Sequence, residues 1–282
     1  MKTINSLSGG KTSSYLAAHY PADYNVFALV RTNDKSCLFP DDKLRQIVSD
    51  KLGVEFIGTL EEDTIIYTML DLEQMLGTKI DWVTGKTFDE IIKSKTRWLP
   101  NKLHRFCTSI MKLEPIFDFW RENINEPVEM RLGFRANEFR RAKSMIEKVN
   151  KNGFLEQKAI IGKRKTQNKW GLVEWQKPSF PLIDDGIFKD KIEEFWKDKN
   201  VRFAYLNNCV GCFHRNELLL KVMSEKHPNK FDWFSKQEIG RNPKDTWKAN
   251  GHIRYEKIKD YKLQMQLFEE DFNECDSGYC GL

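Results

Sequence analysis

The stretch Ser6-Leu7-Ser8-Gly9-Gly10-Lys11-Thr12-Ser13-Ser14 decides how this chain begins to fold. It follows a short apolar run and leads into Tyr15-Leu16-Ala17-Ala18, a pattern typical of a strand that turns into a helix. The glycines let the backbone approach a ligand closely, and the first N–H groups of the helix attract an anion. The stretch therefore predicts a phosphate-binding turn. The alternative is an ordinary strand-to-helix turn with a Ser or Thr cap.

The composition is that of a globular protein of 282 residues, 40% of them hydrophobic, with a net charge of +5. The chain has no run of about 18 apolar residues, and its first residues lack the apolar core of a secretion signal. We therefore expect a cytoplasmic protein without a membrane span. Its six cysteines are expected to be thiols or metal ligands. The modest charge permits an anionic substrate and does not require nucleic acid.

Strand and helix patterns alternate along the chain. Strands are expected at residues 4–7, 25–31, 54–58 and 128–134. Helices are expected from residue 11 and at residues 41–52, 64–76, 88–95, 135–148, 187–197, 216–226 and 261–272. This rhythm predicts an α/β fold, a Rossmann-like and mostly parallel sheet flanked by helices, with ligands at the carboxyl ends of its strands.

Three regions are expected from the distribution of these patterns. Residues 1–149 form the nucleotide-binding α/β domain, 150–181 a basic hairpin or flap, and 182–282 a helical, Cys-bearing region. In the flap, Trp170 and Trp175 lie among lysines. They either stack on the bases of a single-stranded nucleic acid or pack within the hairpin.

The stretch Arg105-Phe106-Cys107-Thr108-Ser109-Ile110-Met111-Lys112-Leu113-Glu114-Pro115 carries basic groups, a hydroxyl and a thiol at fixed offsets. On a helix, Thr108 and Lys112 lie one turn apart on one face, where both can address the same phosphate or sulfate. The alternative is a buried cysteine on an amphipathic helix with a surface lysine.

A second basic motif follows a predicted strand, which leads through Gly133 into a helix with Arg135 in its first turn. A guanidinium group donates two parallel hydrogen bonds to an oxyanion, so Arg135, Arg140 and Arg141 are candidates, with Glu138 holding an arginine in place. The alternative is a solvated helix laced with ion pairs.

Two close cysteine pairs, Cys209 with Cys212 and Cys275 with Cys280, predict one metal site with four thiolate ligands. Zinc and a [4Fe–4S] cluster share this ligand set. The alternative is a redox dithiol formed by Cys209 and Cys212.

Together these motifs resemble the phosphoadenylylsulfate (PAPS) reductase-like family of the PP-loop ATP pyrophosphatase superfamily. The Ser8-Gly9-Gly10-Lys11-Thr12-Ser13 stretch is similar to the PP-loop, and Gly133 to Arg141 resembles an arginine motif of that family. Cys107, Lys112 and Pro115 match the signature Cys-Cys-x-x-Arg-Lys-x-x-Pro, with Thr108 and Met111 at the other positions. Cys280-Gly281-Leu282 resembles the tail whose cysteine attacks the sulfur of a sulfonucleotide.

The resemblance implies a PP-loop/HUP-type fold and an adenine nucleotide, either ATP with Mg²⁺ or the sulfonucleotides PAPS or APS. It implies sulfur-related chemistry, as a sulfonucleotide reductase or as an enzyme that adenylylates a substrate for sulfur transfer. An ATP pyrophosphatase that modifies tRNA or DNA and a non-catalytic nucleotide sensor are alternatives. Partners would be a thioredoxin-like reductant or a nucleic acid, and a homo-oligomer is a further expectation.

The resemblance also assigns roles to residues. The catalytic candidates are Lys112, Arg135 and Cys280. The nucleotide-binding candidates are Ser6, Ser8, Gly9, Gly10, Lys11, Thr12, Ser13, Arg31, Thr32, Arg105, Thr108, Gly133, Arg140 and Arg141. The metal candidates are Cys209, Cys212, Cys275 and Cys280, with Cys107 as a fifth, and a [4Fe–4S] cluster is favoured slightly over zinc. Cys280 is either nucleophile or ligand.

Overall fold

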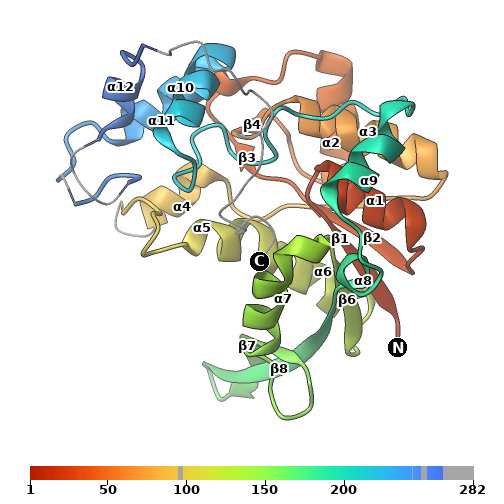
Figure 1. Cartoon of the computed structure of the whole chain (residues 1–282). Helices are drawn as coiled ribbons and strands as arrows, with labels where there is room; N and C mark the ends of the chain where they lie inside the picture. The colour runs from red at the N-terminus through yellow and green to blue at the C-terminus, as the bar shows by residue number, and fades with distance from the viewer. Residues whose placement is uncertain (95–97, 243, 249–252, 263–282) are drawn as a thin grey trace. The chain divides into compact units, whose positions relative to one another are not determined.

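The computed structural model describes residues 1–94, 98–242, 244–248 and 253–262. Within them the chain has an α/β fold whose main sheet contains six strands in the order β5-β2-β1-β6-β8-β7 (Figure 1). β1 (Thr3–Leu7) runs parallel to β2 (Tyr24–Ala28) and to β6 (Val128–Leu132). β6 runs parallel to β8 (Gln167–Ser179), which pairs antiparallel with β7 (Leu155–Arg164). The predicted sheet, mostly parallel and flanked by helices, is confirmed.

The chain divides into two compact units that interleave along the sequence. Unit 1 comprises Met1–Phe27, Met69–Asp81 and Pro115–Val201, and unit 2 comprises Ala28–Thr68, Trp82–Glu114 and Arg202–Leu282. This division differs from the predicted regions 1–149, 150–181 and 182–282. The reason is that most of the chain between β2 and β6 packs with the C-terminal part rather than with the first strands.

Unit 1 holds most of the main sheet and the helices that cover it. These are α1 (Lys11–His19), most of α3 (Thr64–Leu76), most of α6 (Glu114–Asn123), the 3₁₀ turn η3 (Ala136–Glu138), α7 (Phe139–Ile146), α8 (Pro181–Asp184) and α9 (Lys189–Lys197). α1 and α9 lie side by side, with the rings of Tyr15 and Phe195 5.2 Å apart (Figure 1). The helix predicted over 135–148 is present over 136–146. Its first turn is the 3₁₀ turn η3, which begins with a capping box formed by Arg135 and Glu138.

Unit 2 contains a small antiparallel pair, β3 (Arg31–Thr32) with β4 (Gly58–Thr59), and most of the short strand β5 (Asp81–Val83). Its helices are η1 (Lys35–Cys37), α2 (Asp42–Leu52), the start of α3 (Thr64–Leu76), α4 (Phe88–Ser94), α5 (Phe106–Thr108), the π-helical turn η2 (Ser109–Leu113), α10 (Glu217–Lys226), α11 (Pro228–Gln237) and α12 (Tyr255–Ile258). An aromatic cluster of Phe88, Trp233, Phe234, Trp247 and Tyr255 forms the centre of its core.

One strand prediction is correct only for its first part, and another is wrong. The predicted strand over 25–31 is split, because β2 ends at Ala28 and Arg31 begins β3 in the other sheet. The predicted strand over 54–58 is absent from the main sheet, and Gly58 pairs with β3 instead. A Cβ atom on Gly58 would lie 1.9 Å from the carbonyl oxygen of Cys37, so only glycine permits this close approach.

The helices expected over 41–52, 64–76, 88–95, 187–197 and 216–226 are present, with small shifts of their ends. α11 was not expected. The helix predicted over 261–272 lies almost entirely outside the described residues. In the part of the chain that the structure describes, no helix has the length and apolar character needed to cross a membrane.

Candidate functional site

The carboxyl edge of the parallel sheet in unit 1 brings two predicted motifs together. The chain leaves β1 toward β2 on one side, and β6 returns on the other side, so the strand order reverses between β1 and β6. Ligands of open α/β sheets bind at such a switch point. Because Ser6 on β1 is paired with Leu132 on β6, the loops that follow them, Ser8–Gly10 and Gly133–Arg135, begin side by side.

The loop Ser8–Gly10 is held by a hydroxyl network. Ser13 Oγ donates to the carbonyl of Gly10 at 3.1 Å and accepts from the N–H of Ser8 at 3.1 Å, and the Oγ atoms of Ser8 and Ser13 lie 3.0 Å apart. Gly9 has φ of +80°, the left-handed region that favours glycine. Gly10 is the N-cap of α1 and has no side chain to satisfy the first N–H groups of the helix. These N–H groups suit an anion.

Gly133 lies directly against this loop. A Cβ atom at Gly133 would lie 3.0 Å from Cα and 3.1 Å from the backbone nitrogen of Ser13. The end of β6 and the start of α1 thus approach each other as closely as backbone allows. Steric contact rather than backbone conformation favours glycine here, because its φ lies outside the positive range and a Cβ atom would displace the backbone of Ser13 by a few tenths of an ångström.

Glu138 organises two arginines beside Gly133. One carboxylate oxygen accepts from the backbone N–H of Arg135 at 2.8 Å and from its Nε at 3.2 Å, while the other accepts from Arg141. The guanidinium of Arg141 also lies 4.0 Å above the ring centre of Phe134. The prediction that Glu138 holds an arginine in place is confirmed. Arg140, in contrast, is exposed on α7.

Lys11 and Thr12 begin α1, and Lys11 forms an ion pair with Glu193 on α9. The indole N–H of Trp196 on the same helix donates to the carbonyl of Lys11 at 3.0 Å. α9 therefore fixes the first turn of α1 from the side, and the Lys11 ammonium is engaged by a carboxylate.

Several residues predicted as nucleotide-binding, catalytic or metal-binding candidates line a pocket within unit 2. The pocket encloses about 540 Å³, counting its open mouth. Its polar lining residues include Glu61, Arg105, Cys107, Thr108, Lys112, Asn208, Cys209, Cys212 and His214, and its apolar ones include Phe88, Phe213, Phe234 and Trp247. The predicted proximity of Cys107 to Cys209 and Cys212, and of Thr108 to Lys112, is found here.

The helix that carries Thr108 and Lys112 is wound as a π-helical turn over Ser109–Leu113. Such turns occur often at functional sites because they alter the direction of the side chains. Lys112 Nζ binds Glu61 Oε1 at 2.9 Å, with 1% of the Glu61 side chain and 18% of the Lys112 side chain exposed. The other carboxylate oxygen of Glu61 has no hydrogen-bond partner among the described residues.

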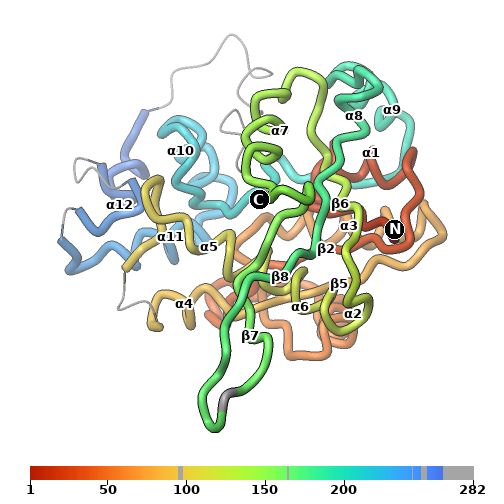
Figure 2. Tube along the Cα trace, turned by 90° about the horizontal axis from the view of Figure 1, so that it is seen from below, coloured from red at the N-terminus to blue at the C-terminus, as the bar shows by residue number. Residues whose placement is uncertain are grey.

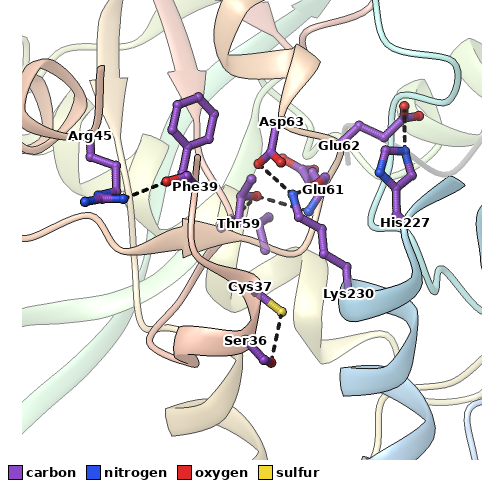
Figure 3. Close-up of polar contacts among 11 residues, drawn as sticks. Ser36, Cys37, Phe39, Arg45, Thr59, Glu61, Glu62, Asp63, His227 and Lys230 are labelled. Carbon is purple, nitrogen blue, oxygen red and sulfur yellow. Dashed lines mark hydrogen bonds and ion pairs between the residues drawn. The ribbon is translucent and has the colours of Figure 1, made fainter. Parts of the chain in front are cut away.

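Glu61 belongs to the acidic run Glu61-Glu62-Asp63, which no sequence motif indicated as part of a site. Glu62 binds His227 at 3.0 Å, and Asp63 binds Lys230 at 2.7 Å, while the Lys230 ammonium also donates to the carbonyl of Glu61 (Figure 3). Thus α11 and the residue before it hold the acidic run in place. No sequence signal links these positions, because they are more than 160 residues apart.

The three cysteines of this pocket are partly buried. Burial raises the pKa of the Cys107 thiol to about 11 and the pKa of Cys209 well above its ordinary value. Burial also lowers the pKa of His214 to about 4. The Cys107 and Cys209 thiols are therefore protonated near neutral pH, and neither is an activated nucleophile by itself.

Three of the five cysteines predicted as metal ligands line the same pocket. Cys107, Cys209 and Cys212 share the pocket, but among the described residues no three His, Cys, Asp or Glu side chains are arranged to hold a metal ion. Cys275 and Cys280 lie outside the described residues. The donor set of three neighbouring thiols suits zinc or an iron–sulfur cluster, and ligation displaces thiol protons.

Arg31 and Thr32 belong neither to the loops that follow β1 and β6 nor to the pocket of unit 2. The Arg31 guanidinium donates to Thr84 Oγ1 at 2.9 Å and to the carbonyls of Glu55 and Gly85 at 3.1 Å each. Thr32 Oγ1 donates to Asp89 at 2.8 Å. The structure thus uses both residues to tie β3 to neighbouring segments of unit 2.

Comparison with known proteins yields one informative relative. A stretch of 107 residues, 37% of this chain, is 33% identical to the uncharacterized protein MJ0066 of Methanocaldococcus jannaschii and covers 22% of that protein. This chain thus spans less than a quarter of the length of the archaeal relative in the match. No family model and no solved structure matches the chain.

Proposed function

We propose that this chain is an adenine-nucleotide-binding PP-loop enzyme of the PAPS reductase-like kind. The observation that supports the proposal most is the meeting of Ser8–Gly10 and Gly133 at the switch point of the parallel sheet. Motifs more than 100 residues apart in the sequence, each predicted to bind phosphate or sulfate, are neighbours there. An ordinary strand-to-helix turn gives no reason for this pairing.

The proposed phosphate site combines three kinds of donor. The backbone N–H groups at the start of α1 bind phosphate oxygens, and the Ser8 hydroxyl donates to one of them when it turns away from Ser13, whose own O–H holds the loop by donating to the Gly10 carbonyl. Arg135 and Arg141, oriented by Glu138, neutralise the charge beside them. Lys11 joins them if the nucleotide displaces Glu193 from its ammonium group.

The reaction follows one of two courses. With a sulfonucleotide, a cysteine thiolate attacks the sulfur, the adenine nucleotide leaves, and a dithiol reductant then releases sulfite. With ATP and Mg²⁺, an oxygen of the substrate attacks the α-phosphorus and pyrophosphate leaves. The raised pKa of Cys107 and Cys209 argues against either as the nucleophile.

We propose that the thiols of unit 2 hold a metal centre instead. Cys107, Cys209 and Cys212 would supply ligands, and Cys275 or Cys280 would complete the set. Iron, sulfide and zinc analysis of protein purified without oxygen tests this directly. A folded protein free of metal would contradict it.

The nucleotide site is tested by calorimetric titration of ATP and of adenylyl sulfates into the full chain. We expect binding of one of these, and a loss of about tenfold or more in affinity for Ser8→Ala combined with Ser13→Ala, because each lost hydrogen bond costs about 1 kcal/mol. Ser94→Ala, on α4, is the matched control. Equal affinity of the double variant and the wild type would contradict the proposal.

Product analysis then separates the two reactions. Sulfite released from a sulfonucleotide in the presence of a dithiol reductant indicates the reductase. Loss of this sulfite in Cys280→Ser, with the metal content equal to that of the wild type, identifies Cys280 as the nucleophile. Pyrophosphate formed from ATP only when tRNA or DNA is added indicates nucleic-acid modification.

A further inference from the structure

The β7–β8 hairpin of unit 1 contains a surface that the packing of the fold does not explain. β8 pairs with β6 only through Gln176–Ser179, whereas it pairs with β7 along the whole hairpin to Arg164 and Gln167. Residues 158–172 therefore form a two-stranded arm, and among the described residues no further strand pairs with it. Figure 2 shows this arm extending beyond the base of the hairpin.

The two tryptophans of the hairpin differ in their surroundings. Trp175, near the base, is 3% exposed and packs edge-on against Phe117, with ring centres 5.4 Å apart. Trp170, on the arm, is 56% exposed. Trp175 thus serves hairpin packing, and Trp170 does not.

Trp170 is the centre of an apolar strip on one face of the arm. Leu172, two positions along β8, is 65% exposed, and the register places Ile160 opposite Trp170 and Lys158 opposite Leu172. Side chains two apart on a strand, and those directly opposite them, share a face. The strip therefore offers a flat aromatic ring and aliphatic neighbours to the solvent.

The arm is also uniformly basic. Residues 157–173 contain five basic residues and no acidic one: Lys158, Lys163, Arg164, Lys165 and Lys169. Lys163, Lys165 and Lys169 are exposed, and Lys158 Nζ lies 6.0 Å from the ring centre of Trp170. Like charges at this density repel one another unless an anionic partner binds.

We infer that the arm formed by residues 158–172 binds single-stranded nucleic acid, with Trp170 stacking on a base and the lysines contacting phosphates. Exposed aromatic rings within a basic surface are the usual platform for unpaired bases, because every base offers a flat π face. A duplex hides those faces within its stack, and an acidic protein would satisfy the lysines without using the ring. The inference goes beyond the proposed function and does not require a bound nucleotide.

The test is fluorescence anisotropy with labelled 12-nucleotide oligothymidylate and oligouridylate and the full chain, without ATP. We expect Trp170→Ala to weaken binding about tenfold with little change in its salt dependence, because stacking is not ionic. Lys163→Ala with Lys169→Ala should also weaken binding about tenfold. It should reduce the slope of log K against log salt by about 1.4, the value for two lost phosphate contacts on a single strand.

Matched controls separate the arm from general charge and aromatic effects. Lys191→Ala with Lys197→Ala removes the same charge from exposed positions of α9, and Trp98→Ala removes another exposed tryptophan. Neither control should change the affinity. Any of four results would overturn the inference. The controls could lose as much affinity as the arm variants, or a duplex of the same length could bind more tightly than the single strand. Polyglutamate could compete as well as unlabelled oligonucleotide, or no binding could occur at micromolar protein.

The nucleotide-site variant Ser8→Ala with Ser13→Ala is included in the same titrations. We expect it to bind the oligonucleotides like the wild type. Failure of ATP binding therefore leaves this inference intact, and failure of oligonucleotide binding leaves the nucleotide site intact.

Discussion

At the scale of single residues, the buried pair of Glu61 and Lys112 makes the sharpest stability prediction. Lys112→Met leaves the Glu61 carboxylate buried without its countercharge, so the free energy of unfolding should fall by about 3–5 kcal/mol. Combining it with Glu61→Gln should recover much of this loss. Denaturant titrations of the four proteins measure both effects, with Lys236→Met in an exposed ion pair as control. A double variant whose loss equals the sum of the single losses would show that the pair is not coupled.

The glycine of the Cys209–Cys212 motif is required by a contact that the motif itself does not indicate. Gly211 lies in a tight turn between Cys209 and Cys212, in which the Cys212 N–H donates to the Cys209 carbonyl at 3.0 Å. Its φ lies outside the positive range, and a Cβ atom there would lie 2.3 Å from the ring of Phe234. The glycine is therefore required by contact with the aromatic core, which no local pattern reveals.

Among the elements, the close contact between the end of β6 and the start of α1 predicts that a larger residue at Gly133 weakens ATP binding by the loop Ser8–Gly10. In Gly133→Ala the new methyl group meets the backbone of Ser13, so the first turn of α1 must shift by a few tenths of an ångström. We expect about tenfold weaker ATP binding, the value of one lost charged hydrogen bond. Gly162→Ala, where a Cβ atom meets nothing within 4 Å, is the control. Unchanged ATP affinity in calorimetry would show that the loop Ser8–Gly10 does not bind the nucleotide.

α4 makes a prediction about pH. At its start, the Glu90 carboxylate accepts from the backbone N–H of Thr87 at 2.7 Å, and this bond lowers the pKa of Glu90. The folded state thus favours the carboxylate, so its stabilisation is present above the unfolded pKa of about 4.3 and is lost as pH falls through the lower, folded pKa. Wild type should exceed Glu90→Gln in unfolding free energy at pH 7, and the gap should close at acid pH. A gap that is constant with pH would contradict this.

At the scale of the whole molecule, local patterns predicted most helices and the parallel sheet but not how the chain is divided. Periodicity at residues 41–52 or 216–226 depends only on neighbouring residues, so α2 and α10 were found. The interleaving of the two units depends on contacts between distant segments. The acidic run at Glu61 was missed for the same reason, since its partners Lys112, His227 and Lys230 follow far along the chain.

The candidate site shows the same limit. Sequence motifs predicted Ser8, Gly133 and Arg135 separately, and the sheet topology explains why the first two meet. Arg31 was a candidate only by its place at a strand end, and its guanidinium is occupied by Thr84 and two carbonyls. A position in the sequence identifies the end of a strand, but not the partners of the side chain there.

Hydrogen–deuterium exchange of the full chain with and without ATP is the most direct test of nucleotide binding at the switch point of the sheet, because it reports where a ligand binds. We expect ATP to slow exchange of the backbone N–H groups in residues 8–14 and 133–141. At an ATP concentration near the wild-type Kd, Ser8→Ala with Ser13→Ala should show much less of this protection. ATP binding that leaves both segments unchanged and protects other parts of the chain would contradict it.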